Sequence, residues 1–223
     1  MLKVFFSIVA RDMKVILNSG TKVFMPIVYL LLILTFFSIS LENTTIGGYK
    51  NILPQIIWLV CLLVSLLNMD ILYKEDFDDG TLEGIVINSE LLEINILAKI
   101  FSYWFFTIIP LVIVGVLMNL LLTGDIITSY VLFTSLFLGT LAISLIGSIA
   151  ASLTLSIKGN SLLLSTIVLP LDIPILIFGT SAVYNSAAGI SYSSELLFLT
   201  LLLVLFLIVS PFASSIGLRN SLD

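Results

Sequence analysis

The chain has 223 residues, of which 59% are hydrophobic and only 10% are charged, and its formal net charge is −5. Soluble domains usually have about 25% charged residues, so this composition excludes a water-soluble globular protein. Apolar runs of about 20 residues predict membrane-spanning helices. Segments of alternating polarity, which would indicate a β-barrel, are absent from the sequence. The sequence therefore predicts an all-α integral membrane protein in which residues 1–223 form a single domain.

Within residues 1–20, an amphipathic helix is predicted over residues 2–17. Its polar side chains recur every three or four positions and so share one face: Lys3, Ser7, Arg11, Lys14 and Asn18. A basic stripe beside a broad apolar face is typical of a helix that lies in the lipid headgroup region. A cytosolic helix docked on the bundle is the alternative.

Six membrane-spanning helices are predicted to follow. Their approximate bounds are Val23–Leu41, Ile52–Met69, Ile96–Leu122, Ile126–Ile157, Leu162–Tyr184 and Leu196–Leu218. Turn-forming residues support the breaks, among them Gly47-Gly48 and Thr123-Gly124-Asp125. Four aromatic residues in the spans are interpreted as anchors at the membrane interfaces: Trp58, Tyr103, Trp104 and Tyr184.

The distribution of lysine and arginine predicts the orientation, because cytoplasmic loops of membrane proteins carry an excess of both. With the N-terminus inside, eight of the nine basic residues fall on the cytoplasmic side and only Lys50 falls on the other. Both termini, and the segment between the second and third spans, are therefore predicted to be cytoplasmic.

That segment, residues 70–93, carries eight of the fourteen acidic side chains. Its core from Tyr73 to Glu83 is too polar for lipid and is predicted to be an aqueous loop. Apolar residues at helical spacing predict a short helix from Gly80 to about Asn88 that lies across the membrane surface. Acidic residues beside an apolar patch could bind a basic groove on a soluble partner. A solvated loop without a partner is the alternative.

Asp172 is the one acidic residue deep within a predicted span, where ionisable groups are costly and often functional. Pro170 and Pro174 flank it, and prolines open the backbone hydrogen bonding of a helix. A functional intramembrane site is one interpretation. A protonated aspartic acid bonded to a neighbouring helix is the other.

Several motifs are missing. There is no phosphate-binding loop, no His-Glu-x-x-His and no Gly-x-Ser-x-Gly, so no catalytic centre and no ATP site are expected in this chain. Asp76, Asp78 and Asp79 lack the ligand spacing of an EF-hand, so no metal site is expected either. Cys61 is the single cysteine, and the chain has no histidine.

The sequence resembles the B subunit of the cytochrome c maturation haem exporter, the CcmB family of ABC transporter permeases. The resemblance extends over essentially the whole chain. Five local matches carry it, and together they are specific: Pro54-Gln55-Ile56-Ile57-Trp58, Tyr73 to Glu83, Leu97-Ala98-Lys99, Leu169-Pro170-Leu171-Asp172-Ile173-Pro174, and Ser210-Pro211-Phe212-Ala213 with Arg219. An acid between the two prolines is not typical of the family, which weakens the functional interpretation of Asp172.

The resemblance implies a non-catalytic permease subunit in a bacterial inner membrane, with the mitochondrial inner membrane as the less favoured location. A separate ATP-binding subunit would hydrolyse ATP to drive haem delivery, or release of a haem chaperone, during c-type cytochrome assembly. Further haem-handling membrane proteins would be partners. The role of a coupling helix that contacts the ATPase would fall on one segment: Asp76, Asp79, Gly80, Thr81, Leu82 and Glu83.

The same resemblance implies that this chain binds no cofactor itself. ATP would lie on the partner, and haem would be a substrate of the complex, since histidine, the usual axial ligand, is absent. Two permease copies, as a homodimer or within the complex, are expected because ABC permeases need two six-span halves. Three alternatives remain: an ABC permease for lipid or drug, a proton-linked secondary carrier that uses Asp172, and a non-transporting scaffold.

Overall fold

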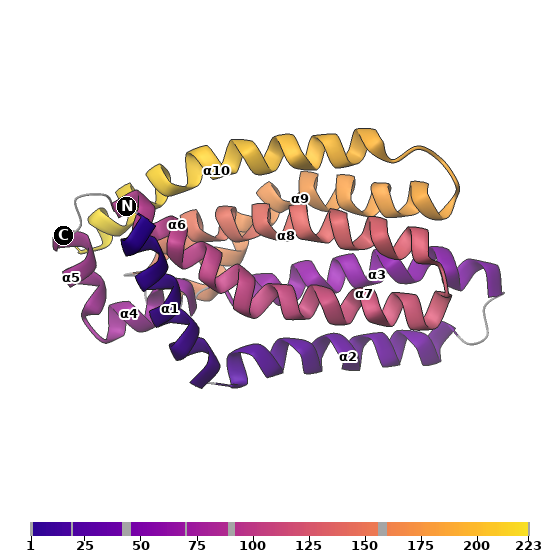
Figure 1. Ribbon diagram of the computed structural model, residues 1–223, viewed down its shortest axis with the longest axis horizontal. Coiled ribbons are helices and arrows are strands. Elements are labelled where there is room, and N and C mark those ends of the chain that lie inside the picture. The colour runs from indigo at the N-terminus through magenta and orange to yellow at the C-terminus, as the bar shows by residue number, and fades with distance from the viewer. Residues whose placement is uncertain are drawn as a thin grey trace.

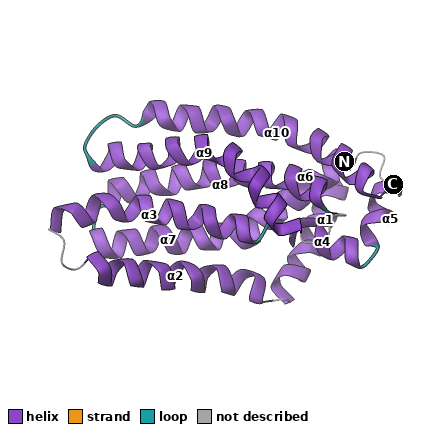
Figure 2. Ribbon diagram, turned by 180° about the vertical axis from the view of Figure 1, so that it is seen from behind, coloured by secondary structure: helices purple, strands orange, loops and turns teal. Residues whose placement is uncertain are grey.

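The computed structural model describes residues 2–18, 20–41, 46–69, 71–88, 92–155 and 160–222. Within these ranges all regular secondary structure is helical, which confirms the predicted all-α class (Figure 2). The elements are α1 (Leu2–Asn18), α2 (Thr21–Leu41), α3 (Ile46–Leu67), α4 (Ile71–Asp78), α5 (Thr81–Asn88), α6 (Leu92–Tyr103), the π-helical segment η1 (Trp104–Ile108), α7 (Ile109–Thr123), α8 (Ile126–Thr154), α9 (Asn160–Ala187) and α10 (Ser193–Leu222).

The long helices lie side by side as a bundle, and the short helices gather at one end (Figure 1). At that end lie α1, α4, α5, the start of α6 and the end of α10. We call it the polar end, because four of the eight residues of α4 are charged. The turn between α7 and α8 and the loop between α9 and α10 lie at the opposite end (Figure 1).

Five helical segments in the described part of the chain are long and apolar enough to cross a membrane. They involve α3, the continuous α6–η1–α7 helix, α8, α9 and α10. The first predicted span coincides with α2, in which Phe24–Ile39 is the apolar stretch among the residues whose side chains the structure describes. Five spans therefore have structural support, and the sixth stays a prediction. Helix α4 follows α3 after a turn, and its charges place it outside the hydrocarbon.

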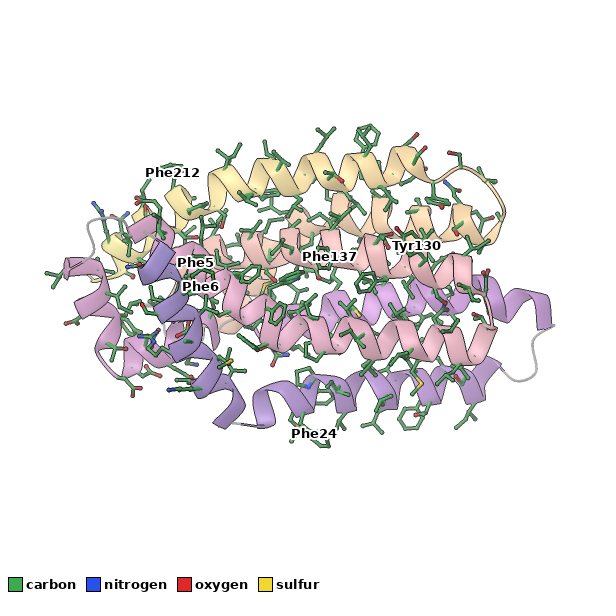
Figure 3. The ribbon with its side chains drawn as sticks, viewed as in Figure 1. Phe5, Phe6, Phe24, Tyr130, Phe137 and Phe212 are labelled. Carbon is green, nitrogen blue, oxygen red and sulfur yellow. The ribbon has the colours of Figure 1, made fainter. Side chains whose placement is uncertain are left out.

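The outward faces of the bundle are apolar, as expected for surfaces in contact with lipid. Phe24 on α2 and Phe212 on α10 both point away from the bundle (Figure 3), with exposed fractions of 65% and 60%. An exposed apolar surface of this extent could not persist in water. The chain is a multi-pass membrane protein.

Helix α8 lies at the centre of the bundle and packs against α3, α7, α9 and α10. Small residues of α8 and α10 allow close approach of neighbouring groups within this chain. Gly147 of α8 lies against Met69, and Gly217 of α10 lies against Ser152 of α8.

The interpretation of Trp58 and Trp104 as interfacial anchors is wrong, because both side chains are buried within the bundle. The ring of Trp58 fits between Gly139 of α8 and Gly179 of α9, and its Nε1 donates to Ser135 Oγ at 2.9 Å. Tyr103 is also buried, whereas Tyr184 is exposed. Glycines on facing helices leave room for an indole, and the hydroxyl satisfies its N–H.

Helix ends follow the predicted turn chemistry at one site and depart from it at another. Gly124 has a φ of 69° and ends α7, and the carboxylate of Asp125 accepts hydrogen bonds from the first amides of α8. Gly47-Gly48 was predicted as a turn but lies in the first turn of α3. The first amides of a helix make no intrahelical hydrogen bonds, so glycine at these positions weakens the helix little.

Replacement of Gly139 or Gly179 with alanine tests the Trp58 packing. A Cβ at either position would collide with the indole ring, so each variant should lose about 1–3 kcal/mol of stability through overpacking. Thermal unfolding of the purified protein in lipid nanodiscs measures this loss. Gly84→Ala is the control, because its Cβ would meet open space. Equal stability of all three variants would contradict the packing described.

Candidate functional site

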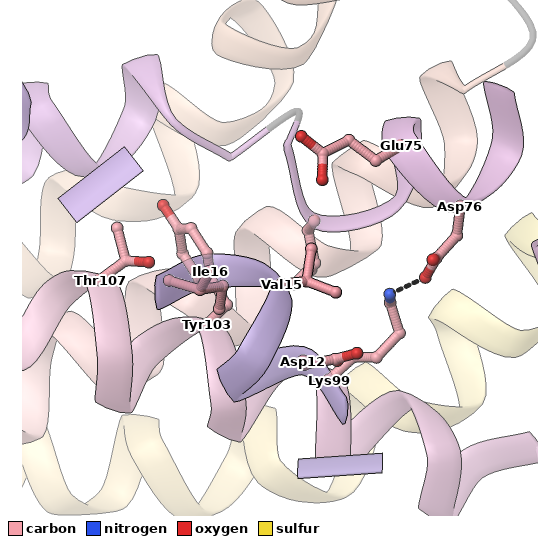
Figure 4. A pocket seen from close by; sticks show the side chains of 9 residues that line it. Asp12, Val15, Ile16, Glu75, Asp76, Lys99, Tyr103 and Thr107 are labelled. Atoms are coloured by element: carbon pink, nitrogen blue, oxygen red, sulfur yellow. Dashed lines mark hydrogen bonds and ion pairs between the residues drawn. The ribbon is translucent and has the colours of Figure 1, made fainter. Parts of the chain in front are cut away.

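A carboxylate at the polar end joins residues of four helices. Asp76 of α4 is paired with the Nζ of Lys99 of α6 (Figure 4). The same Oδ2 accepts from Arg11 Nη2 of α1 at 3.2 Å. Its other oxygen accepts from Thr81 Oγ1, at the start of α5, at 3.2 Å. We call Asp76, Lys99, Arg11 and Thr81 the Asp76 cluster.

The Asp76 cluster is partly shielded from water. The side chains of Lys99 and Asp76 are 10% and 19% exposed. Burial opposes ionisation of Asp76, but the pairs with Lys99 and Arg11 and the hydrogen bond from Thr81 outweigh it. The pKa of the Asp76 carboxyl therefore lies below its ordinary value. An ionised carboxylate between two cations then fixes α4 relative to α1 and α6.

A pocket lies beside this cluster, between α1, α4 and the α6–η1 helix (Figure 4). Asp12 of α1, Asp76 and Lys99 line its polar side, and Ile16, Leu72 and Thr107 belong to the rest. Asp12 Oδ1 forms an ion pair with Arg11 Nη2 at 2.8 Å. Helix α1 packs along α6, so the residues of α1 described here contact the bundle. Contact of α1 with the membrane surface stays a prediction.

The predicted aqueous loop is mainly helical. Helices α4 and α5 form a hairpin, with Asp79 and Gly80 in the turn between them. Gly80 has a φ of 71°, which L side chains rarely adopt, so glycine is favoured there. The predicted short helix after Gly80 is present as α5.

The candidate coupling residues are divided between the inside and the outside of this hairpin. Leu82 is buried and fixes α5 to the bundle, whereas Asp79 and Glu83 are exposed. Ile87, further along α5, has an exposed fraction of 79%. We call Asp78, Asp79, Glu83 and Ile87 the acidic surface. Asp76 lies apart from it, since its carboxylate is engaged within the chain.

The second candidate site is in α9. Asp172 is completely buried, and among the described residues neither carboxyl oxygen has a hydrogen-bond partner. Pro170 and Pro174 are both within the helix and exposed. The coupling candidates and Asp172 are therefore two separate features on different helices.

Sequence reasoning missed the partners of Asp76. Arg11 and Lys99 are 65 and 23 residues away from it. The sequence places Arg11 in a basic stripe and Lys99 in a family motif, and neither pattern predicts a pair with Asp76. The spacing of Arg11 predicts that it lies on the basic face of α1. No local pattern predicts which acidic side chain it pairs with.

The whole chain matches a known family. The model of the CcmB protein family matches residues 3–221. The chain belongs to the CcmB family. It is 32% identical to Heme exporter protein B of Haemophilus influenzae over 220 residues, which is 99% of each chain. It is 33% identical to Heme exporter protein B of Pseudomonas aeruginosa over 221 residues, again 99% of each.

A third relative has a similar sequence identity. Heme exporter protein B of Escherichia coli K12 is 33% identical over 219 residues, or 98% of this chain and 99% of that one. Membership of the CcmB family confirms the resemblance stated from the local motifs. It covers the Asp76 cluster, the acidic surface and Asp172 alike, because all of them lie within the matched residues.

Asp76→Asn should lower the free energy of unfolding by about 2 kcal/mol, since the shielded ammonium of Lys99 loses a charged acceptor. Asp78→Asn, an exposed acid on the same helix, is the matched control. The further variant Lys99→Met should restore part of the loss in the Asp76→Asn background, as both charges are then gone. Denaturation of the nanodisc-embedded protein measures all four chains.

The pH dependence has a defined sign. Because the folded pKa of Asp76 is lowered, its stabilisation is fully present above the carboxyl's unfolded pKa. It is lost as the pH falls through the lowered folded pKa. The difference in stability between the native chain and Asp76→Asn should therefore shrink in acid. A difference that is constant with pH would contradict the ion-pair assignment.

Proposed function

We propose that this chain is the permease subunit of a haem exporter that acts in c-type cytochrome biogenesis. The relatives that match it from end to end are named Heme exporter protein B. In this proposal the chain has six spans, with α2 as the first, and lies in the bacterial inner membrane. It carries no catalytic group, and haem is a substrate of the complex.

The partner is an ABC-type ATP-binding subunit, and the acidic surface is where it docks. The observation that carries this assignment is that the hairpin has one side held on the bundle and another side exposed. Asp76 and Leu82 hold α4 and α5 on the bundle, while Asp79 and Glu83 project into solvent. A rigid element with exposed acids and an exposed Ile87 suits a groove with basic walls and an apolar floor.

The distribution of charge supports a cytoplasmic polar end. Arg11, Lys14, Lys74, Lys99 and Arg219 all belong to helices or helix ends at the polar end (Figure 1). Cytoplasmic segments are enriched in lysine and arginine. Both termini and the acidic surface would then face the compartment that contains ATP. Two copies of this chain per complex would supply the two halves of the permease, with other haem-handling membrane proteins and the haem chaperone as further partners.

A proton-linked carrier is the second candidate, and the buried carboxyl of Asp172 is the observation that favours it. A lone carboxyl in a span is costly and is often functional. Such a carrier would work without an ATPase. A scaffold would retain its partners but would not change the rate of ATP hydrolysis when haem is added. A carrier and a scaffold would therefore each give a different result from an exporter when the chain is purified with its partners.

Affinity purification of the chain in mild detergent tests the proposal. The expected result is an ATP-binding subunit at a fixed ratio, two copies of this chain, and ATP hydrolysis that responds to added haemin. Purification without an ATPase would overturn the exporter assignment. An ATPase whose turnover ignores haemin would favour a scaffold or a permease for lipid or drug.

Glu83→Lys and Gly80→Ala test the docking surface. Reversal of the Glu83 charge should reduce the amount of co-purified ATPase about tenfold, because like charges would then meet across the interface. Alanine at Gly80 should reduce it less, since the left-handed turn is strained by roughly 1–2 kcal/mol. The level of chain inserted in the membrane is the control and should not change. Normal co-purification in both variants would exclude docking at the acidic surface.

A further inference from the structure

A chain of three hydroxyl groups connects the α4–α5 hairpin to two membrane-spanning helices. The hydroxyl of Tyr73 on α4 lies 2.7 Å from Ser148 Oγ on α8. That Oγ lies 2.8 Å from Ser214 Oγ on α10. All three side chains are completely buried. Three helices that are far apart in the sequence are therefore joined by polar contacts within an apolar interior.

Neighbouring serines on the same helices behave differently. Ser144, one turn before Ser148 on α8, donates to Thr140 O at 2.9 Å within its own helix. Ser215, next to Ser214 on α10, donates to Phe212 O at 2.9 Å within its own helix. Ser148 and Ser214 instead bond to hydroxyl groups on other helices, so they connect α4, α8 and α10 through their side chains.

The position of Tyr73 in α4 places the hydroxyl chain between the acidic surface and the membrane-spanning helices. Helix α4 has only eight residues, with Tyr73 near its start and the Asp76 cluster one turn later. Leu82 is buried, and α5 contacts α10. Helix α4 contacts α8 directly, so it gives a short route from the acidic surface to the central helix, beside the route through α5 and α10. Tyr73 of α4 bonds directly to Ser148 of α8 and, through Ser148, is connected to Ser214 of α10.

The contact between α8 and α10 is itself close and partly polar. Ser210 of α10 donates to the carbonyl oxygen of Leu145 of α8 at 2.8 Å, one turn from the hydroxyl chain. Further along, Gly217 lies against Ser152, with no space for a Cβ. The two helices are therefore held together closely beside Ser148.

We propose that Tyr73 is a positioning residue whose hydroxyl transmits movement of the α4–α5 hairpin to α8 and α10. The proposal rests on the function given above for its link to ATP hydrolysis, but the physical attachment does not depend on that function. Tyr73 contacts neither ATP nor haem. It determines how far a movement of the acidic surface is felt by the membrane-spanning helices.

Tyr73→Phe removes only the hydroxyl and preserves the buried ring. Ser148→Ala and Ser214→Ala remove the other two links. Ser144→Ala and Ser215→Ala are matched controls, because each deletes a buried or nearly buried hydroxyl that bonds within its own helix. The double variant Tyr73→Phe/Ser148→Ala should be no worse than the more severe single variant if the hydroxyls act as one chain.

The first measurement is amide hydrogen exchange of the full chain in nanodiscs, without any partner. Tyr73→Phe should raise the exchange rate of residues 71–88 about fivefold, the factor that one neutral hydrogen bond supports. Ser144→Ala and Ser215→Ala should leave that segment unchanged. No change in Tyr73→Phe, or an equal change in the controls, would overturn the proposal whatever the chain exports.

The second measurement uses the complex with its ATPase. Tyr73→Phe should keep the amount of co-purified ATPase and its KM for ATP, while the haemin-stimulated kcat falls about fivefold. A purely structural role would reduce assembly and the controls would share the loss, which would overturn the transmission role. If the native chain has no ATPase partner, the proposed function fails and the exchange measurement still decides the attachment.

Discussion

The shared carboxylate of Asp76 is the interaction on which the polar end depends. Two cations from two other helices meet it: Lys99, which like Asp76 is largely shielded from water, and Arg11, whose side chain is 41% exposed. Opposite charges are stabilising in such a place only when each finds its partner, because an unpaired charge would be severely destabilising. This arrangement joins α4 to α1, to α6 and to the start of α5.

Polar contacts elsewhere in the molecule join helices where the hydrophobic effect cannot. Apolar side chains prefer lipid and protein almost equally, so helices in a bilayer associate through close packing and hydrogen bonds. The chain uses both. Trp58 fits between two glycines and bonds to Ser135, and Tyr73, Ser148 and Ser214 join three helices. The hairpin and the spans are thus parts of one connected structure.

The relation to the CcmB family concerns the whole chain, because the relatives align over 97–99% of it. Identity near one third is enough to show the family, and the family makes a role in haem export the first hypothesis. The division of the hairpin into an anchored and an exposed side adds a physical reason for where an ATPase would bind. Asp172 has no such arrangement around it among the described residues, so it is weaker support for a function.

Local chemistry determined much of this protein from the sequence alone. Apolar runs between charged or glycine-containing breaks marked the long helices, Gly80 marked the start of the short helix that follows it, and basic residues marked the polar end. These features depend on residues close together in the chain, so the sequence is sufficient to predict them.

Only the tertiary structure decided which distant residues meet. The ion pairs of Asp76 with Arg11 and Lys99 join residues that are far apart in the chain. Trp58 was read as an interfacial anchor but is buried against two glycines. Tyr73 has no local feature that separates it from any other tyrosine. Each depends on how helices pack across the bundle, where contact partners are set by rotation and depth rather than by sequence spacing.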